Sequence, residues 1–195
     1  FRGSVHRWRC CQQGGEDQEG QAIHLLHFRY AFNLFHTFVR DYLTPRIGIH
    51  ARERGGPDNL IYFISDLLYA NEHRIGLTYG NKKYTNSQVK KALGAGIVFI
   101  PMLNPDGVNH DQANSNLWRK NRNPASSRPN EPLSVGVDLN RNFDFLWNFT
   151  QKFDPSVAPA STNASSQAFY GTAPFSEPES RDMAWVYDEY PNIHW

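Results

Sequence analysis

A histidine and a glutamate lie three residues apart directly after a short apolar run, and this arrangement constrains the fold more than any other feature. The run is residues 47–49, and the pair is His50 and Glu53. A strand that ends in this spacing can direct both side chains to one point beyond the edge of a sheet. Imidazole nitrogen and carboxylate oxygen are both good zinc ligands. The pair therefore predicts part of a metal site, although the same spacing also arises by chance in surface turns.

Three further polar clusters lie downstream, and two of them follow a short apolar run directly. These are residues 104–107 after the apolar run 97–103, the mostly basic cluster 119–122, and residues 138–142 after the run 135–137. In open α/β sheets, ligands bind beyond the carboxyl ends of the strands. We therefore expect the clusters to converge with His50 and Glu53 on one rim of a sheet.

Hydrophobic periodicity and end signals place the elements. We expect a helix from Pro57 to about residue 71, a short helix over 85–93 stopped by Gly94, and a helix opened by a capping box of Ser176 and Glu179. Strands are expected over 19–26, over 97–103 and from residue 192, and residues 104–107 read as a turn. Long polar loops are expected over 109–132 and 148–173. The prediction is one α/β domain with a mixed, mostly parallel β-sheet covered by helices on both faces.

Composition excludes some partners and leaves others open. The hydrophobic content of 39% is ordinary for a globular protein, and the formal net charge of +1 gives no reason to expect nucleic acid or an anionic membrane as a partner. No apolar run is long enough to span a membrane. The two cysteines, Cys10 and Cys11, are too few for a disulfide framework.

Five motifs together resemble those of the zinc metallocarboxypeptidases of the pancreatic carboxypeptidase A type. In the order and at about the spacing of that family, they are HARE at 50–53, NPDG at 104–107, WRKNR at 118–122, GVDLNRNF at 136–143 and FYGTAPFSEPES at 169–180. The resemblance runs from about Glu19 to Trp195. It is greatest to secreted fungal members, which share the run RGGPDNLIYFISDLL after HARE. The resemblance implies that residues 1–195 form a partial peptidase catalytic domain.

The resemblance implies that His50 and Glu53 bind one Zn²⁺ ion. Such an ion polarises the scissile carbonyl and lowers the pKa of a bound water toward neutrality. Catalytic zinc sites of this kind use three protein ligands and keep one position open. The third ligand of the family, a histidine, is expected beyond Trp195, and so is its general-base glutamate.

The remaining site residues are also implied by the resemblance. Arg122 matches the arginine that steadies the oxyanion, Asn140 and Arg141 match the pair that grips the terminal carboxylate, and Arg119 matches a secondary substrate-binding arginine. Without the family, Arg119 and Arg122 read as part of a solvated basic loop with Lys120 and Arg128. Asn140 then reads as a strand-end turn former and Asp138 as a structural residue.

The expected function is that of a zinc-dependent metallocarboxypeptidase. It would release C-terminal residues from peptides and proteins by attack of zinc-activated water. A related reading is an amidohydrolase that acts on a non-peptide amide. The alternative from another class is a catalytically inactive fragment or degraded gene copy, with at most weak binding of peptide C-termini.

Two segments depart from the family pattern, residues 1–18 and residues 29–45. The second is rich in aromatic residues, and the apolar strand before His50 is shortened to residues 47–49. An insertion or an amphipathic helix would explain it. We favour translated non-coding sequence, because a central strand that loses half its length would be costly.

Secretion is expected from the resemblance and from two N-glycosylation sequons, at Asn148 and Asn163. Both sequons lie in loop-like surroundings. The first twenty residues show no signal-peptide pattern, which we take to mean that the start is incomplete or misassigned.

Overall fold

The computed structural model describes residues 48–191. In chain order its elements are α1 (Gly55–Glu72), β1 (Leu77–Tyr79), β2 (Lys82–Tyr84), α2 (Asn86–Ala95), α3 (Pro105–Asn114), the 3₁₀ turns η1 (Pro124–Ser126), η2 (Pro132–Ser134) and η3 (Leu139–Arg141), α4 (Phe149–Lys152) and α5 (Pro178–Glu189). The strands predicted over 19–26 and from residue 192, and the atypical segments 1–18 and 29–45, lie outside the described residues.

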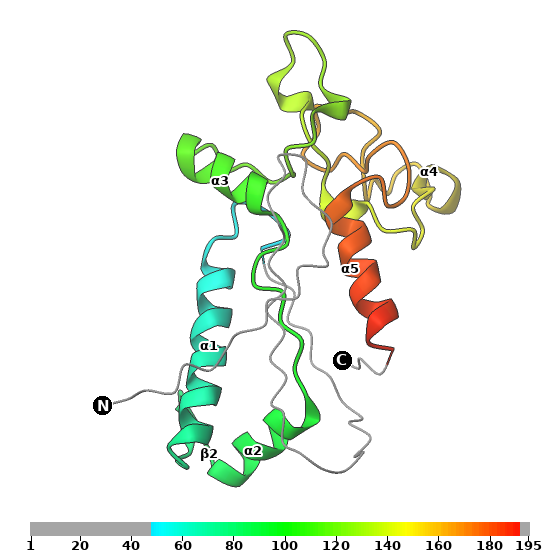
Figure 1. The fold of residues 1–195 in the computed structure, drawn as a ribbon. Helices are drawn as coiled ribbons and strands as arrows, with labels where there is room; N and C mark the ends of the chain where they lie inside the picture. Colours follow the sequence, from blue (N-terminus) through cyan, green and yellow to red (C-terminus); the bar gives the residue numbers. More distant parts are fainter. Residues whose placement is uncertain (1–47, 192–195) are drawn as a thin grey trace.

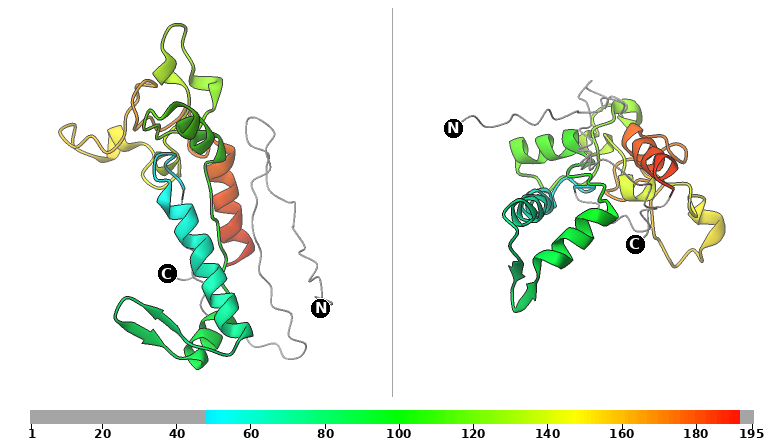
Figure 2. Two further views of the ribbon diagram at one scale, coloured as in Figure 1. Left: turned by 90° about the vertical axis from the view of Figure 1, so that its left-hand side faces the viewer. Right: turned by 60° about the horizontal axis from the view of Figure 1, so that its bottom comes forward.

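The core is built around the apolar segment 97–103, which runs between α1 and α5 (Figures 1 and 2). Ile97 and Phe99 pack with α1, whereas Val98 and Ile100 pack with α5. Successive side chains therefore point to opposite faces, as in a strand, and each face is covered by a helix. Residues 97, 99 and 100 form isolated bridges, and no regular strand spans 97–103 among the described residues. The predicted cover on both faces is confirmed at this segment.

Helix α1 forms where its apolar periodicity predicts it. Leu60, Ile64 and Leu67 recur on one side and are buried, whereas Ile61 and Tyr62 on the other side are exposed. The antiparallel hairpin of β1 and β2, with Leu77 opposite Tyr84, follows the end of this helix. Within residues 48–191, this hairpin is the one regular sheet.

Helix α2 begins as predicted but ends later. Thr85 is its N-cap and forms a capping box with Gln88, which satisfies two backbone N–H groups at the helix start. The stop predicted at Gly94 is wrong, because Gly94 lies inside the helix. The helix ends at Ala95, and Gly96 follows with a positive φ of 84°, a conformation that glycine adopts at little cost.

Helix α3 replaces the turn predicted at residues 104–107 and the first part of the loop predicted over 109–132. Asn104 caps the helix by accepting a hydrogen bond from the Gly107 N–H at 3.0 Å. Pro105 occupies the first turn, where its missing N–H and fixed φ are tolerated. The same four residue types suit a turn and a helix start, and the capped helix is the form that this chain adopts.

Helix α5 has the predicted apolar side but not the predicted cap. Met183 and Val186 are buried against the segment 97–103. The N-cap is Glu177, and no side chain caps the helix. The Ser176 hydroxyl donates instead to the Glu177 carboxylate at 2.6 Å, and Glu179 is buried in a hydrogen-bond network with another loop. The capping box of Ser176 and Glu179 is therefore wrong.

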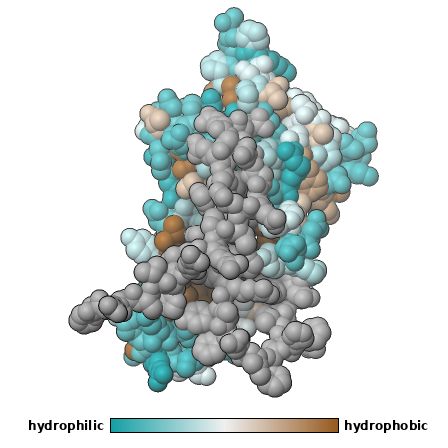
Figure 3. All heavy atoms as spheres, in the orientation of Figure 1, coloured by the Kyte–Doolittle hydropathy of each residue, from teal (hydrophilic) through white to brown (hydrophobic). Residues whose placement is uncertain are grey.

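The residues between α3 and α5 are mostly loops and short turns, and they carry the candidate site. Residues 124–134 form the tip at the top of Figure 1, and Figure 3 shows that this tip is largely hydrophilic. Buried asparagines tie the loops together beneath it. Asn142, for example, donates to the Tyr170 and Ala173 carbonyls and accepts from the Glu177 N–H and the Ser180 hydroxyl.

Candidate metal and substrate site

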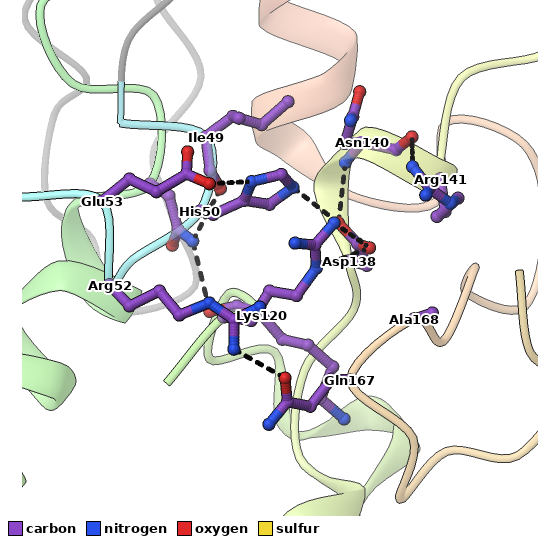
Figure 4. A network of polar contacts seen from close by, with 12 residues as sticks. Ile49, His50, Arg52, Glu53, Lys120, Asp138, Asn140, Arg141, Gln167 and Ala168 are labelled. Carbon is purple, nitrogen blue, oxygen red and sulfur yellow. Dashed lines mark hydrogen bonds and ion pairs between the residues drawn. The ribbon is translucent and has the colours of Figure 1, made fainter. Parts of the chain in front are cut away.

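The segment that carries His50 turns sharply, and this turn brings its imidazole to the Glu53 carboxylate. The Glu53 N–H donates to the His50 carbonyl at 3.0 Å, and the Ala51 N–H donates to the Arg119 carbonyl at 3.2 Å. His50 Nδ1 then lies 3.0 Å from Glu53 Oε1 (Figure 4). His50 is buried, whereas Glu53 is exposed. Two side chains with metal-binding atoms therefore meet at one point, as the spacing predicted.

The other imidazole nitrogen faces a buried carboxylate. His50 Nε2 lies 3.3 Å from Asp138 Oδ1, and Figure 4 shows the ring between Glu53 and Asp138. Burial alone would raise the pKa of the Asp138 carboxyl. The nearby His50 imidazole and Arg119, whose charged guanidinium donates a hydrogen bond to this carboxylate, outweigh burial, so this pKa lies below its usual value. Asp138 is therefore held as a carboxylate that orients the imidazole.

These contacts suit a histidine that binds a metal through Nδ1. Histidine ligands generally donate their second ring N–H to a carboxylate or carbonyl, which fixes the tautomer and the ring orientation. His50 has Glu53 at one nitrogen and Asp138 at the other. Among residues 48–191, no group of three or more histidine, cysteine, aspartate or glutamate side chains is placed to hold a metal ion. The described residues thus fit a zinc site as two of its ligands.

Arg119 directs its guanidinium to Asp138 and not to the exterior. Its Nε lies 3.0 Å and its Nη2 2.9 Å from Asp138 Oδ2, and its side chain is largely buried. A planar guanidinium suits such a two-point contact with a carboxylate. The reading of this region as a solvated basic loop is therefore wrong for Arg119.

The prediction of a solvated basic loop is also wrong for Lys120, because only 2% of its surface is exposed. Its ammonium donates to the Leu133 carbonyl at 2.8 Å and to the Ala164 carbonyl at 2.6 Å. Burial and the nearby charge of Arg122 lower the pKa of Lys120 to about 8. Lys120 thus holds the surrounding loops together from inside.

Arg122 lies over an aromatic ring. Its guanidinium carbon is 4.6 Å from the centroid of the Trp118 ring, and its side chain is half-buried. His110 meets the same indole edge-on, with ring centroids 4.9 Å apart. Burial and then the charge of Arg122 lower the pKa of His110. The loop predicted over 109–132 is wrong at His110, because this residue belongs to α3.

Asn140 and Arg141 lie in the turn η3, next to Asp138. The Asn140 N–H donates to Asp138 Oδ1 at 3.2 Å, and Figure 4 shows its side chain pointing away from Asp138. Arg141 donates from Nε to the Pro159 carbonyl at 2.5 Å and from Nη1 to the Asn140 carbonyl at 3.0 Å. Asp138 therefore connects this turn to His50 and Arg119.

A buried polar network joins the loop that carries Asn121 to the loop that carries Val137 and to the start of α5. Asn121 pairs with Val137 through two hydrogen bonds, one from its own N–H at 3.0 Å and one to its side-chain oxygen at 2.8 Å. Its side-chain nitrogen donates to the carboxylates of Glu177, at 2.7 Å, and Glu179, at 3.2 Å. Burial raises the pKa of Glu179 to about 7, and the neighbouring carboxylates Glu177 and Asp106 add to the rise.

The sequence did not identify the parts played by Asp138, Trp118 and Asn121. Asp138 directly follows the short apolar run 135–137. This position indicates the end of a strand, but it does not show which residues Asp138 contacts. Trp118 and Asn121 are the two residues of the WRKNR motif that are not basic. Only the fold shows that they hold the basic residues in place.

The zinc carboxypeptidase family profile matches residues 13–193 of this chain. The chain belongs to the zinc carboxypeptidase family. Family members of known sequence that resemble it include human carboxypeptidase O, 33% identical over 138 residues, and carboxypeptidase B of Helicoverpa zea, 32% identical over 146 residues. The inactive metallocarboxypeptidase ECM14 of Ajellomyces dermatitidis is 32% identical over 143 residues.

These zinc carboxypeptidases are much longer than the present chain. The matches cover 70%, 73% and 73% of this chain but 30%, 28% and 20% of the respective relatives. Solved zinc carboxypeptidase structures confirm the α/β fold. Thrombin-activatable fibrinolysis inhibitor superposes with a TM-score of 0.63 at 25% identity, covering 92% of this chain and 38% of that one. Carboxypeptidase A of Helicoverpa armigera gives 0.62 at 26%, covering 92% and 37%.

Proposed function

We propose that this chain is part of a zinc-dependent metallocarboxypeptidase that releases C-terminal residues from peptides. The observation that carries the proposal is the contact of His50 with Glu53 on one ring nitrogen and Asp138 on the other. The family membership supports it, because hydrolysis of peptides at the C-terminus is the activity that the family name describes.

His50 and Glu53 would hold the zinc ion together with a third ligand. When bound, the ion supplies Lewis-acid polarisation of the scissile carbonyl and activation of water. Asp138 keeps the His50 ring in one orientation by its contact with Nε2. Arg119, which pairs with the other oxygen of Asp138, holds that carboxylate in place.

The arginines and Asn140 would bind the peptide. Arg122 would donate to the carbonyl oxygen as negative charge develops on it, a contribution on the order of 3 kcal/mol for a well-placed donor. Asn140 and Arg141 would bind the terminal carboxylate, for which a guanidinium and an amide are suited. In this assignment Arg119 acts on the peptide only secondarily, because Asp138 engages its guanidinium.

We further propose that the protein is secreted and glycosylated. Asn148 and Asn163, the two sequon asparagines, are both exposed. No helix among residues 48–191 has the length and apolar character needed to cross a membrane.

The residues proposed to bind the terminal carboxylate, Asn140 and Arg141, provide the test of the proposed function. In the full-length gene product, Arg141→Ala should raise KM and lower kcat/KM by roughly tenfold to a hundredfold on peptides with a free C-terminus. Hydrolysis of a peptide with an amidated C-terminus should be slow in both proteins. Arg128→Ala provides the control, since Arg128 is an exposed arginine at the tip. Equal kinetics for Arg141→Ala and the unmodified protein would refute the carboxylate assignment.

The second candidate is a catalytically silent member that binds peptide C-termini weakly. The similarity to an inactive metallocarboxypeptidase supports it. Zinc content and peptidase activity of the full-length product separate the two functions. Stoichiometric zinc with chelator-sensitive release of terminal residues supports the enzyme. Peptide binding without turnover, in protein supplied with zinc, supports the silent member.

A further inference from the structure

We propose that Trp118 is a positioning residue, whose indole ring fixes the guanidinium of Arg122 relative to the segment that carries His50 and Glu53. The role of Arg122 in the reaction rests on the proposed function. The placement of its guanidinium by Trp118 is a separate property of the fold.

The indole is itself held at several points. The Trp118 backbone N–H donates to Asp111 Oδ1 at 2.6 Å, and the indole Nε1–H donates to the Asn121 carbonyl at 3.2 Å. Asp111 is fully buried and also pairs with Arg54, which follows Glu53 directly in the chain. The ring is therefore fixed to α3 and to the start of α1 before Arg122 meets it.

The ring also packs on the segment that carries the candidate metal ligands. Trp118 forms a buried cluster with Ala51 and Val108, and only 7% of its surface is exposed. Ala51 is the residue between His50 and Arg52. Because one side of the cluster is the His50 segment and Arg122 lies over the same ring, Trp118 relates the two parts of the site.

The contact of Arg122 with this ring is a cation–π arrangement. The guanidinium carbon lies 4.6 Å from the ring centroid, within the distance at which the negative face of an indole attracts a cation. Lys120 lies further from the same centroid, at 5.7 Å, and two backbone carbonyls hold its ammonium. The pKa values of His110 and Lys120 are lowered partly by the charge of Arg122, which agrees with a guanidinium held close to both.

The arrangement has a chemical consequence. A guanidinium on a flexible side chain would have to be ordered during the reaction, whereas one that is oriented beforehand stabilises developing charge without that cost. Loss of the ring face should therefore act on kcat more than on KM. A cation–π contact of this kind corresponds to about a threefold to thirtyfold change in rate.

Two substitutions of Trp118 separate the ring face from simple bulk. Trp118→Leu keeps apolar contact with Ala51 and Val108 but removes the aromatic face, whereas Trp118→Phe keeps a face and removes the indole N–H. In the zinc-loaded full-length protein, Trp118→Leu should lower kcat by about threefold to thirtyfold with KM changed less than about threefold. Trp118→Phe should recover most of kcat. Trp185→Leu, on α5, provides the control and should leave both constants unchanged.

Coupling to Arg122 distinguishes positioning from general damage to the fold. In an Arg122→Ala background, Trp118→Leu should have no further effect on kcat. Independent, multiplicative losses would overturn the proposal. If Arg122→Ala itself leaves kcat unchanged, the proposed role of Arg122 in catalysis fails, and the kinetics no longer bear on Trp118.

A second measurement tests the placement without any activity. The Nε–Hε proton NMR resonance of Arg122 should be shifted upfield by the indole ring current in the unmodified protein. The resonance is assigned by its loss in Arg122→Ala. Trp118→Leu should move it toward the position of exposed arginines, whereas Trp185→Leu should not. An unchanged resonance in folded Trp118→Leu protein overturns the proposal, even if the protein proves to be a silent family member.

Discussion

His50 Nε2 and Asp138 Oδ1 lie 3.3 Å apart, and this contact joins two motifs that are far apart in the sequence. Asp138 also binds Arg119 through its other oxygen and the Asn140 N–H through the oxygen that faces His50. One buried carboxylate therefore sets the relation between the candidate metal ligands, the basic loop and the candidate carboxylate grip.

The substitution Asp138→Asn should weaken zinc binding. The amide side chain would retain a similar shape but lose the charge that fixes the imidazole, and such changes typically lower metal affinity about tenfold to a hundredfold. The measurement is the zinc dissociation constant of the full-length protein, by competition with a chelator. Asp144→Asn, at an exposed carboxylate on the same loop, is the matched control. Equal affinity of the two variants would contradict the orienting role.

Replacing Lys120 by methionine should destabilise the fold. The substitution preserves most of the buried volume but leaves the Leu133 and Ala164 carbonyls without their donor. We expect a loss of about 2–4 kcal/mol in the free energy of unfolding, measured with urea. Lys152→Met, at an exposed lysine of α4, should change it by less than about 0.5 kcal/mol. Similar midpoints for the two variants would show that Lys120 is not a structural donor.

Because of Glu179, the free energy of unfolding should fall as the pH rises. Because burial raises the pKa of Glu179 from 4.5 to about 7 in the folded state, the folded protein binds a proton that the unfolded chain has released in this range. The free energy of unfolding should therefore decline between about pH 4.5 and 7, by on the order of 3 kcal/mol from this group. Glu179→Gln should flatten the decline, as measured by urea unfolding at several pH values. A slope equal to that of the unmodified protein would mean that other groups dominate.

Two glycines should respond in opposite ways to alanine. Gly136 has a positive φ of 80°, and a Cβ atom there would collide with the Asn121 carbonyl, so Gly136→Ala should cost about 2–4 kcal/mol of unfolding free energy. Gly94 lies inside α2 with open space around it, so Gly94→Ala should stabilise the protein by about 0.5–1 kcal/mol. Thermal and urea unfolding of both variants provide the measurement. If Gly136→Ala unfolds with the same free energy as the unmodified protein, the loops that carry Asn121 and Gly136 can move apart.

The elements that could be predicted are those encoded by local pattern. The stripe of Leu60, Ile64 and Leu67 repeats at helical spacing, so α1 was recognisable without any knowledge of its neighbours. The end of α2 was misjudged because Gly94 and Gly96 are both plausible stops, and packing decides between them. Residues 104–107 show the limit of local chemistry, since Asn-Pro-Asp-Gly suits a turn as well as a capped helix start.

The approach of His50 to Glu53 could be predicted from the sequence, whereas the other contacts of the candidate site could not. His50 and Glu53 were recognisable because their spacing is local, and their 3.0 Å approach agrees with it. Burial of Lys120, and of Glu177 and Glu179, depends on partners some 13 to 58 positions away along the chain, which no local pattern reveals. For this reason the basic loop was misread as solvated and Glu179 as a capping residue.

The two helices that cover the segment 97–103 are synthesised at different times, which has a consequence for folding during translation. The α1 face of this segment can be covered early, because residues 55–72 are synthesised before it. Its other face waits for Met183 and Val186, which leave the ribosome much later. In the interval, a nascent chain displays Val98, Ile100 and Leu103 to the cytosol or lumen, the kind of exposure that invites association between chains. Chaperone dependence should therefore be greatest before α5 emerges, and should fall once it has docked.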